Sequence, residues 1–288
     1  MSGTSASRRK VGAIGPTVVP VARADFIEGM AKGMAVLEAF DTQRQRLNAT
    51  LAAERAGITR AAARRHLLTL AHLGYLETDG SYYWLAAKVL RFSGSYLATA
   101  RLPRQVQPTL NRLAAQAAES FSVAVLDGDE VVIIGRSGFE RAPAGGAQPG
   151  IRVLAYGLHL GARLPAHATS TGRVLLAAKS SLEFSGWLKQ KADSGGLARL
   201  TLHTCVEPRQ FRALISEVRR SDYCLASEAH ELGVVAVAVP LRNMRGQTVA
   251  ALNVVGSSQR SEAAESWKVD MLALLQDAAA ELRPLLQA

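Results

Sequence analysis

The sequence predicts an α+β protein made of two globular parts. In the first third of the chain, apolar residues recur at the three- and four-residue steps of helices, whereas after about residue 120 they alternate in short runs typical of strands. The chain has 288 residues, which is enough for two domains. The net charge is also distributed unevenly between the two parts. Residues 1–104 carry fifteen Lys and Arg against seven Asp and Glu, and residues 105–288 carry nineteen Lys and Arg against seventeen Asp and Glu.

The first part therefore holds +8 of a net charge of +10. Such an excess favours a polyanionic partner, because cations that neutralise phosphates release counterions. A solvated charged surface would give the same count, so charge alone leaves both interpretations open.

The composition excludes several classes of protein. No run of eighteen apolar residues exists, and the first 25 residues lack the compact apolar stretch of a signal peptide, so we expect a cytoplasmic protein with no membrane partner. The two cysteines, Cys205 and Cys224, form no Cys-x-x-Cys pair, which favours reduced, buried thiols over a disulfide or a zinc site. We expect no cofactor.

Residues 1–25 mix Ser, Gly, Pro and basic residues without a usable period and are expected to form a flexible tail. Between residues 26 and 40 the apolar spacing predicts an amphipathic helix. The apolar positions are Phe26, Ile27, Met30, Met34, Leu37 and Phe40.

Two short helices follow, separated by one glycine. The segment 48–50 (Asn-Ala-Thr) offers caps for a helix that ends at Ala56, Gly57 supplies a left-handed turn residue, and Thr59 can cap a third helix that ends at His72. This is the helix-turn-helix pattern, in which the second of the two helices lies in the DNA major groove. The small core between the helices is expected from Leu51, Ile58, Ala62, Leu67, Leu68 and Leu70.

Residues 75–85 alternate around an Asp-Gly turn, the signal for a two-stranded hairpin. A hairpin directly after a recognition helix is a wing, so residues 26–86 are predicted to form a winged helix-turn-helix DNA-binding domain. Arginines early on that helix can pair with guanine edges or hold phosphates, and the sequence does not decide which does which. The alternative is a generic three-helix unit with surface arginines. The candidate DNA contacts are Thr50, Thr59, Arg60, Ala62, Arg64, Arg65, Ser81 and Tyr82.

Residues 87–104 are predicted to be a linker helix, with Pro103 and Pro108 breaking the helical run. In residues 105–288, the segment 120–137 predicts a strand, an Asp-Gly-Asp turn and a second strand. Further elements are expected at 151–156 (strand), 170–178 (helix), 208–221 (helix), 234–257 (two strands turning at Met244 to Gly246) and 263–285 (helix). Antiparallel strands with interspersed helices are typical of an α+β sensor-like domain.

Two later segments carry a resemblance to a known family. "LHLGARLPAHATSTGRVLLA" (158–177) and "SEAHELGVVAVAVPLRNMRGQTVAALNV" (227–254), with the wing and linker, resemble the IclR-type transcriptional regulators, and most closely the branch that controls protocatechuate and 4-hydroxybenzoate catabolism. Over residues 26–285, the resemblance implies an amino-terminal winged helix for double-stranded operator DNA and a GAF-like carboxy-terminal domain for a small carboxylate effector. It also implies homodimers or tetramers.

The resemblance also implies where an effector binds. The positions that match the polar pocket of glyoxylate- and pyruvate-sensing members are Ala226, Ala236, Asn253 and Val255. Small apolar groups enlarge the cavity, as an aromatic ligand such as protocatechuate or 4-hydroxybenzoate, or the ring-opened β-ketoadipate, would need. Arg152 or Arg163 could hold the carboxylate bidentately. Hydrogen bonds are expected from Gly161, His167, Thr169, Ser170 and Asn253.

Other functions fit the residues less well. Ser170 and His167 could suggest a hydrolase, but no Gly-x-Ser-x-Gly elbow surrounds the serine, and the histidines show no metal-ligand spacing. A ligand-free architectural DNA binder would leave about 180 sensor-like residues without a task. We therefore expect a regulator without enzymatic activity. We favour an activator of aromatic catabolism genes that works with RNA polymerase, and the alternative is a repressor that responds to a different small organic acid.

Overall fold

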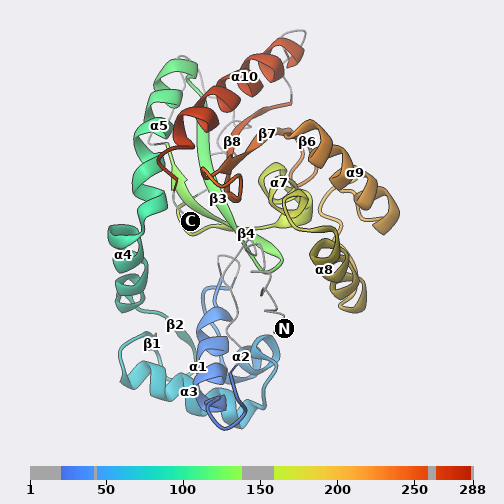
Figure 1. Cartoon of the computed structure of the whole chain (residues 1–288). Coiled ribbons are helices and arrows are strands. Elements are labelled where there is room, and N and C mark those ends of the chain that lie inside the picture. The colour runs from blue at the N-terminus through green and yellow to red at the C-terminus, as the bar shows by residue number, and fades with distance from the viewer. Residues whose placement is uncertain (1–20, 42–43, 138–158, 259–263, 287–288) are drawn as a thin grey trace, which may run out of the picture. The chain divides into compact units, whose positions relative to one another are not determined.

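The computed structural model describes residues 21–41, 44–137, 159–258 and 264–286. These residues form two compact units, one ending at Thr99 and the other beginning at Ala100 (Figure 1). The amino-terminal unit contains α1 (Glu28–Glu38), α2 (Ala49–Ala56), α3 (Arg60–His72), β1 (Leu76–Thr78), β2 (Tyr83–Leu85), the 3-10 helix η1 (Ala87–Val89) and α4 (Leu90–Thr99).

The predicted helix-turn-helix is confirmed down to its caps. The side chain of Asn48 accepts hydrogen bonds from the N–H groups of Thr50 and Leu51, both at 3.0 Å, and so begins α2. Gly57 ends α2 with a φ of +64°, a left-handed conformation that suits glycine. Thr59 then caps α3 by accepting from the N–H of Ala62 at 3.3 Å.

The prediction of the small core is wrong for one residue, Leu68. Leu67 and Leu70 are buried, and Leu51 and Ile58 pack partly buried beside them, but Leu68 is 42% exposed. The reason is the helical period, because the buried face of α3 passes through Ala63, Leu67 and Leu70 and turns position 68 away from it. Ala62, also predicted for this core, is half-buried.

The predicted wing is also confirmed. β1 and β2 pair antiparallel, with Glu77 opposite Trp84, and the indole Nε1 of Trp84 donates to Glu77 Oε2 at 2.9 Å. At the turn, Asp79 Oδ1 accepts from the N–H groups of Ser81 and Tyr82 at 3.0 and 2.8 Å. Arg46 ties the hairpin to the chain before α2, because its guanidinium lies 4.5 Å from the Trp84 ring centroid and 2.8 Å from Asp79.

The prediction that Pro103 and Pro108 break the helical run is wrong. α4 ends at Thr99, and α5 (Arg101–Ala117) runs through both prolines, so the predicted linker helix over 87–104 is divided among η1, α4 and the start of α5. Pro103 lies in the first turn, where no intrahelical N–H bond is lost. Pro108 costs about 3 kcal/mol in a helix interior, and the burial of Val106, Leu110 and Leu113 on one face offsets it.

The described strands of the carboxy-terminal unit form one antiparallel sheet in the order β5-β4-β3-β8-β7-β6. The strands are β3 (Ser120–Asp127), β4 (Glu130–Arg136), β5 (Arg163–Pro165), β6 (Cys224–Ser227), β7 (Val234–Arg242) and β8 (Thr248–Ser257). The helices, besides α5, are the 3-10 helix η3 (Ala166–Ala168), α7 (Ser170–Ala177), α8 (Ser181–Asp193), α9 (Pro208–Ser221) and α10 (Ala264–Leu282). The sequence did not predict α8, β5 or β6, and the strand expected at 151–156 lies outside the described residues.

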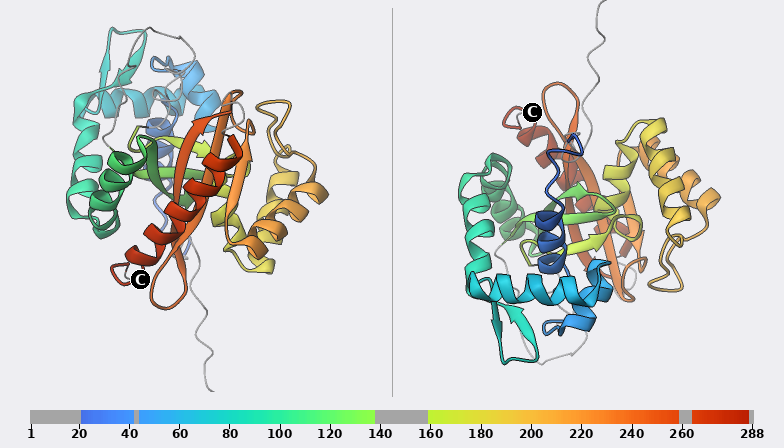
Figure 2. Two further views of the ribbon diagram at one scale, coloured as in Figure 1. Left: turned by 90° about the horizontal axis from the view of Figure 1, so that it is seen from above. Right: turned by 90° about the horizontal axis from the view of Figure 1, so that it is seen from below.

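Different helices cover the two faces of this sheet. α5 and α10 pack on one face through Leu110 and Leu275, and α7, α8 and α9 pack on the other through residues such as Leu175 and Phe211. In Figure 2 the red α10 and the yellow to orange α8 and α9 accordingly lie on different sides of the strands.

Side-chain size differs between the two faces. On β7, Val235, Val237 and Val239 belong to the core under α5 and α10, whereas Ala238 belongs to the core under α7. On β3 the residues alternate in the same way, because Phe121 faces the first core and Ala124 the second. Small residues therefore gather on the α7 face, where they leave room for a cavity.

The start of α7 lies against η3 with no space for a side chain. A Cβ built on Gly172 would lie 2.1 Å from the carbonyl oxygen of Ala166 and 2.3 Å from its Cα. Any side chain here must push α7 away from η3, because backbone atoms cannot yield as a flexible side chain can.

We predict that Gly172→Ala destabilises the carboxy-terminal unit by about 3 kcal/mol, lowering its melting temperature by roughly 6–12 °C. The matched control is Gly186→Ala on α8, where a Cβ meets nothing within 4 Å. This substitution should stabilise the helix by up to about 1 kcal/mol, because alanine has the higher helix propensity. Circular dichroism during heating measures the melting temperature of each variant. Equal melting temperatures for the two variants would contradict the close packing of α7 against η3.

Candidate functional site

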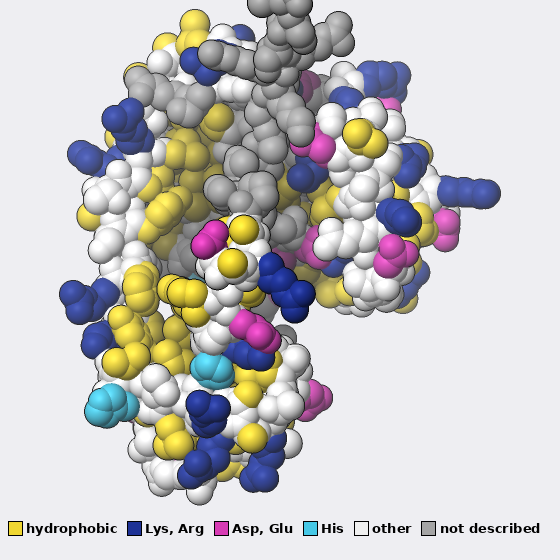
Figure 3. Space-filling view, turned by 60° about the horizontal axis from the view of Figure 1, so that its bottom comes forward, with side chains coloured by type: hydrophobic (Ala, Val, Ile, Leu, Met, Phe, Trp, Pro, Cys, Tyr) yellow, Lys and Arg dark blue, Asp and Glu magenta, His cyan; other side chains and the backbone are white. Residues whose placement is uncertain are grey.

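The amino-terminal half of α3 presents three arginines to solvent. Arg60, Arg64 and Arg65 are exposed, while Ala63 and Leu67 on the opposite face of the helix are buried in the core of the unit. None of the three forms an ion pair with an acidic side chain of the described residues, whereas Arg46 pairs with Asp79 and Arg55 with Asp41. Figure 3 shows Lys and Arg side chains gathered at the lower end of this unit. The three cations of α3 are thus available for an external anion.

The other predicted DNA contacts lie on the same helix pair and on the wing. Thr50 is exposed in the first turn of α2, and Thr59 is exposed with its hydroxyl engaged as the α3 cap. Ser81 and Tyr82 are exposed at the wing turn. A helix with free cations and a projecting hairpin can reach a groove and its flanking phosphates at once.

A cavity lies on the α7 face of the carboxy-terminal sheet. Its empty space, including the part open to solvent, is about 720 Å³. The described residues that line it are Ser122, Ala124, Ile133, Leu164, Ala168, Thr169, Ser170, Thr171, Ala226, Ala229, His230, Glu231, Val234, Ala236, Asn253 and Val255. Most of these side chains are apolar or small, and the few polar ones are therefore informative about a ligand.

One polar group at this cavity lacks a partner. Ser170 is only 1% exposed, and its hydroxyl makes no hydrogen bond within the described part of the chain. It is the first residue of α7, whose cap Thr169 accepts from the N–H of Gly172 at 3.1 Å. The N–H groups of Ser170 and Thr171 precede the first bonds within the helix, so the positive end of α7 meets the cavity beside an unpaired hydroxyl.

A second polar pair lines the floor of the cavity. Ser122 and Asn253 are register partners on β3 and β8, and the Ser122 hydroxyl donates to Asn253 Oδ1 at 2.5 Å. Both side chains are buried. The Asn253 amide nitrogen has no further hydrogen bond to a described residue and can donate to a ligand.

The loop between β6 and β7 brings two ionisable side chains to the cavity. Among the described lining residues, His230 and Glu231 are the ones that titrate. Burial lowers the pKa of His230 below its usual value and so favours the neutral imidazole, and the charge of Glu231 acts against that shift. Neither residue was predicted as a site residue, although both lie in the segment "SEAHELG" on which the family resemblance rests.

The predicted effector residues divide into two groups. Thr169, Ser170, Ala226, Ala236, Asn253 and Val255 line the cavity. Arg163, Gly161 and His167 are not among the described lining residues.

Arg163 does not fit the expected role of carboxylate clamp. Its guanidinium binds two carboxylates of this chain, Asp127 at 2.8 Å and Glu130 at 2.7 Å, so its charge is already paired within the protein. Gly161 is an exposed turn residue with a φ of +82°. His167 is buried elsewhere, with Nε2 2.9 Å from the Ala198 carbonyl and its ring against Phe211. Arg152 lies outside the described residues.

The geometry gives no support to hydrolysis or metal chemistry at this serine. His167 contacts the Ala198 carbonyl, and the Ser170 hydroxyl has no described hydrogen-bond partner, so the two do not form a nucleophile–base pair. Within the described ranges, no group of three His, Cys, Asp or Glu side chains is placed to hold a metal ion. Likewise, no described helix is long and apolar enough to cross a membrane.

Comparison with known protein families matches both units. Residues 29–80 match the IclR helix-turn-helix domain, and residues 94–283 match the bacterial transcriptional regulator IclR C-terminal domain. The chain belongs to the IclR family. It is a DNA-binding transcriptional regulator and not an enzyme, and the second match spans every described residue that lines the cavity.

Individual relatives of this IclR-family regulator are similar over most of their length. The p-hydroxybenzoate hydroxylase transcriptional activator of Acinetobacter baylyi is 49% identical over 91% of this chain and 92% of that protein. The Pca operon regulatory protein of the same organism is 49% identical over 91% and 90%. Among solved structures, a double mutant of the inducer-binding domain of PobR from Acinetobacter, in complex with 3-hydroxybenzoic acid, has 42% identity and a TM-score of 0.54, covering 64% of this chain and 98% of that domain.

We predict that Arg64→Ala and Arg65→Ala weaken operator binding while the fold stays intact. A base-reading arginine should cost roughly 1–3 kcal/mol and relax one operator position, and a phosphate-contacting arginine should weaken all sequences alike and flatten the salt dependence. The control is Arg220→Ala, which removes an exposed arginine of α9 in the other unit. Gel-shift titrations at several salt concentrations distinguish these cases, and unchanged affinity in both α3 variants would rule out α3 as the reader.

Proposed function

We propose that this regulator controls genes of aromatic acid catabolism in response to a hydroxybenzoate-like carboxylate bound in the cavity of its carboxy-terminal unit. The observation that carries the proposal is the unpaired, buried hydroxyl of Ser170, a residue at the start of α7 that lines an otherwise largely apolar cavity. The names of the two Acinetobacter baylyi relatives, and the 3-hydroxybenzoic acid in the related PobR domain, support the same ligand class.

The cavity has the kind of wall that an aromatic ring needs. Most of its lining side chains are small or apolar, as in most small-molecule pockets. Ala226, Ala236 and Val255 form an apolar wall without a charged group. A ring that covers this wall gains about 25 cal/mol for each Å² of apolar surface removed from water, a gain that a two- or three-carbon acid is too small to obtain.

The start of α7 can hold the carboxylate without a cation. Backbone N–H groups at a helix amino terminus, with the helix dipole behind them, form a ready anion site. Ser170 adds a hydroxyl donor that is desolvated and unpaired without a ligand. Hydrogen bonds from these groups to an ionised carboxylate are charge-assisted and stronger than neutral ones. This arrangement takes the place of the arginine clamp that the sequence suggested.

The effector acts by favouring one arrangement of the DNA-bound protein over another. A ligand shifts such an equilibrium only through its different affinity for the two arrangements. One relative is named as an activator, so we favour activation, with RNA polymerase as the partner at the promoter. Repression in response to a different small organic acid is the alternative. Such a regulator works where the chromosome is, in the cytoplasm.

We further propose that the chain works as a homodimer or tetramer on a near-palindromic operator. In the amino-terminal unit, α1 and the segment before it expose Phe26, Ile27, Met30 and Met34, and α4 exposes Leu90, Phe92 and Tyr96. One winged helix leaves few large apolar side chains in water unless another surface covers them. A two-fold protein reads a two-fold site.

We predict that 4-hydroxybenzoate or protocatechuate binds with a micromolar dissociation constant, equivalent to about 8 kcal/mol, and that glyoxylate and pyruvate bind far more weakly. Ser170→Ala should weaken aromatic acid binding about tenfold or more, because it removes a hydrogen bond to a charged group. Ser216→Ala on α9, whose hydroxyl donates to the Arg212 carbonyl, is the control. Titration calorimetry measures all of these affinities, and pyruvate binding tighter than every aromatic acid would overturn the ligand assignment.

We also predict that light scattering gives a mass of at least twice 30.7 kDa at micromolar concentration. Met30→Glu should weaken this association and binding to the full operator, because it places a charge in the apolar surface of α1, where Met30 is 67% exposed. Leu202→Glu is the control, since Leu202 is 85% exposed in the other unit. A monomeric wild-type protein that binds half-sites as tightly as full sites would disprove the assembly.

A further inference from the structure

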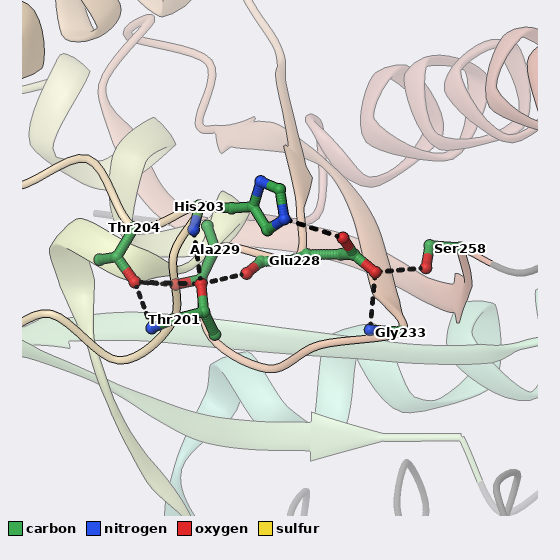
Figure 4. A network of polar contacts seen from close by, with 7 residues as sticks. All are labelled: Thr201, His203, Thr204, Glu228, Ala229, Gly233 and Ser258. Atoms are coloured by element: carbon green, nitrogen blue, oxygen red, sulfur yellow. Dashed lines mark hydrogen bonds and ion pairs between the residues drawn. The ribbon is translucent and has the colours of Figure 1, made fainter.

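The loop between β6 and β7 is held in one position by side chains outside it. Thr201 donates from its hydroxyl to the Glu228 carbonyl at 2.6 Å, and Thr204 donates to the Ala229 carbonyl at 2.8 Å (Figure 4). The Thr204 hydroxyl also accepts from the N–H of Thr201 at 2.8 Å, so the two threonines support each other. The backbone just before His230 is therefore fixed from the α8–α9 connection.

The Glu228 side chain fixes the other end of the loop. Its carboxylate accepts from the N–H of Gly233 at 2.9 Å and from the Ser258 hydroxyl at 2.8 Å, and the imidazole of His203 lies 3.3 Å away (Figure 4). Glu228 adopts a φ of +52°, which is uncommon for a residue other than glycine and persists where the surroundings hold it. Both ends of the segment 229–232 are thus set before any ligand arrives.

The loop and the start of α7 are separate elements that both line the cavity. Ala238 packs in the core beneath α7, Ala236 and Val234 line the cavity, and the loop ends at Gly233. Strand residues advance about 3.3 Å each, so the loop end at Gly233 lies roughly 17 Å along the strand from Ala238. A ligand with its carboxylate at Ser170 would extend its far side toward His230 and Glu231.

The charges favour that orientation over the reverse. The positive end of α7 attracts an anion, whereas the Glu231 carboxylate repels one. An ionised carboxylate accepts hydrogen bonds and cannot donate them, so Glu231 suits a hydroxyl group of the ligand. His230, as a neutral imidazole, can accept from one hydroxyl or donate to it.

On the basis of the proposed function, we propose that His230 and Glu231 form a hydroxyl-recognising subsite that selects ring-hydroxylated aromatic acids over unsubstituted ones. The two residues determine specificity, and Glu228, acting through the loop backbone, is a positioning residue. A ring without a hydroxyl leaves Glu231 and His230 without their partner in a partly desolvated site, a mismatch that discriminates strongly between ligands.

The test compares benzoate, 4-hydroxybenzoate and protocatechuate by calorimetry on the full chain. Wild-type protein should bind the hydroxylated acids at least tenfold more tightly than benzoate. Glu231→Ala and His230→Ala should each reduce this ratio at least fivefold. In Glu231→Ala, affinity for benzoate should stay the same or rise, because the repulsive charge is gone. A general loss of folding would instead lower the affinity for all three acids together.

Matched controls remove the same side chains elsewhere. Glu217→Ala takes an exposed carboxylate from α9, and His72→Ala takes an exposed imidazole from α3. Both should keep the wild-type ratio of affinities. Melting curves of every variant report whether the fold is intact.

The outcomes separate the two proposals. If the wild-type protein binds none of the three acids, the proposed effector class is wrong, and the subsite falls with it. If it binds them but does not distinguish benzoate from its hydroxylated forms, or if Glu231→Ala and His230→Ala both keep the wild-type ratio, the subsite is disproved while the effector class stands.

Discussion

The contact between α7 and η3 is the constraint on which the candidate effector site depends. Gly172 lies directly on the backbone of Ala166, and Leu175 and Leu176 are fully buried one turn later, so α7 has one possible depth above the sheet. That depth places the start of the helix, with Ser170, at the cavity wall. Small strand residues, among them Ala124, Ala226 and Ala236, line the cavity beside the larger Ile133 and Val255, whereas the opposite face carries mainly valine and leucine. One sheet thus provides a solid core on one face and, where small side chains gather on the other, a binding cavity.

What the sequence predicted well is what local chemistry determines. The helix-turn-helix follows from Asn48, Gly57 and Thr59, whose capping and turn roles act within three residues of themselves. The hairpins at 75–85 and 234–257 follow from period-two alternation and turn residues in the same way. Even α9 has the bounds that were predicted, because its apolar face is strongly periodic.

What the sequence missed depends on partners far along the chain. Arg163 looked like a carboxylate clamp, but it pairs with Asp127 at the end of β3 and Glu130 at the start of β4, more than thirty residues earlier. His230 and Glu231 reach the cavity because Glu228 and two threonines fix their loop. These contacts leave no periodic pattern in the sequence that could have predicted them. Pro108 remains inside α5 because tertiary burial outweighs its local cost. Six of the effector residues that the family resemblance implied line the cavity, whereas pairing between distant side chains could not be read from the sequence.

The unpaired Ser170 hydroxyl gives the cavity a reason to respond to a ligand. A buried donor without a partner destabilises a fold by about 1–3 kcal/mol. No described residue accepts a hydrogen bond from Ser170, so this destabilisation persists when no ligand is bound. A carboxylate that accepts from Ser170 removes the cost and adds its own attraction to the helix end, so the carboxy-terminal unit becomes more stable with the ligand than without it. A regulator needs such a difference, because an effector shifts an equilibrium only by as much as its affinity differs between the two states. An arginine whose charge is already paired in the empty protein, as that of Arg163 is, gains less from a ligand carboxylate and would offer a smaller difference.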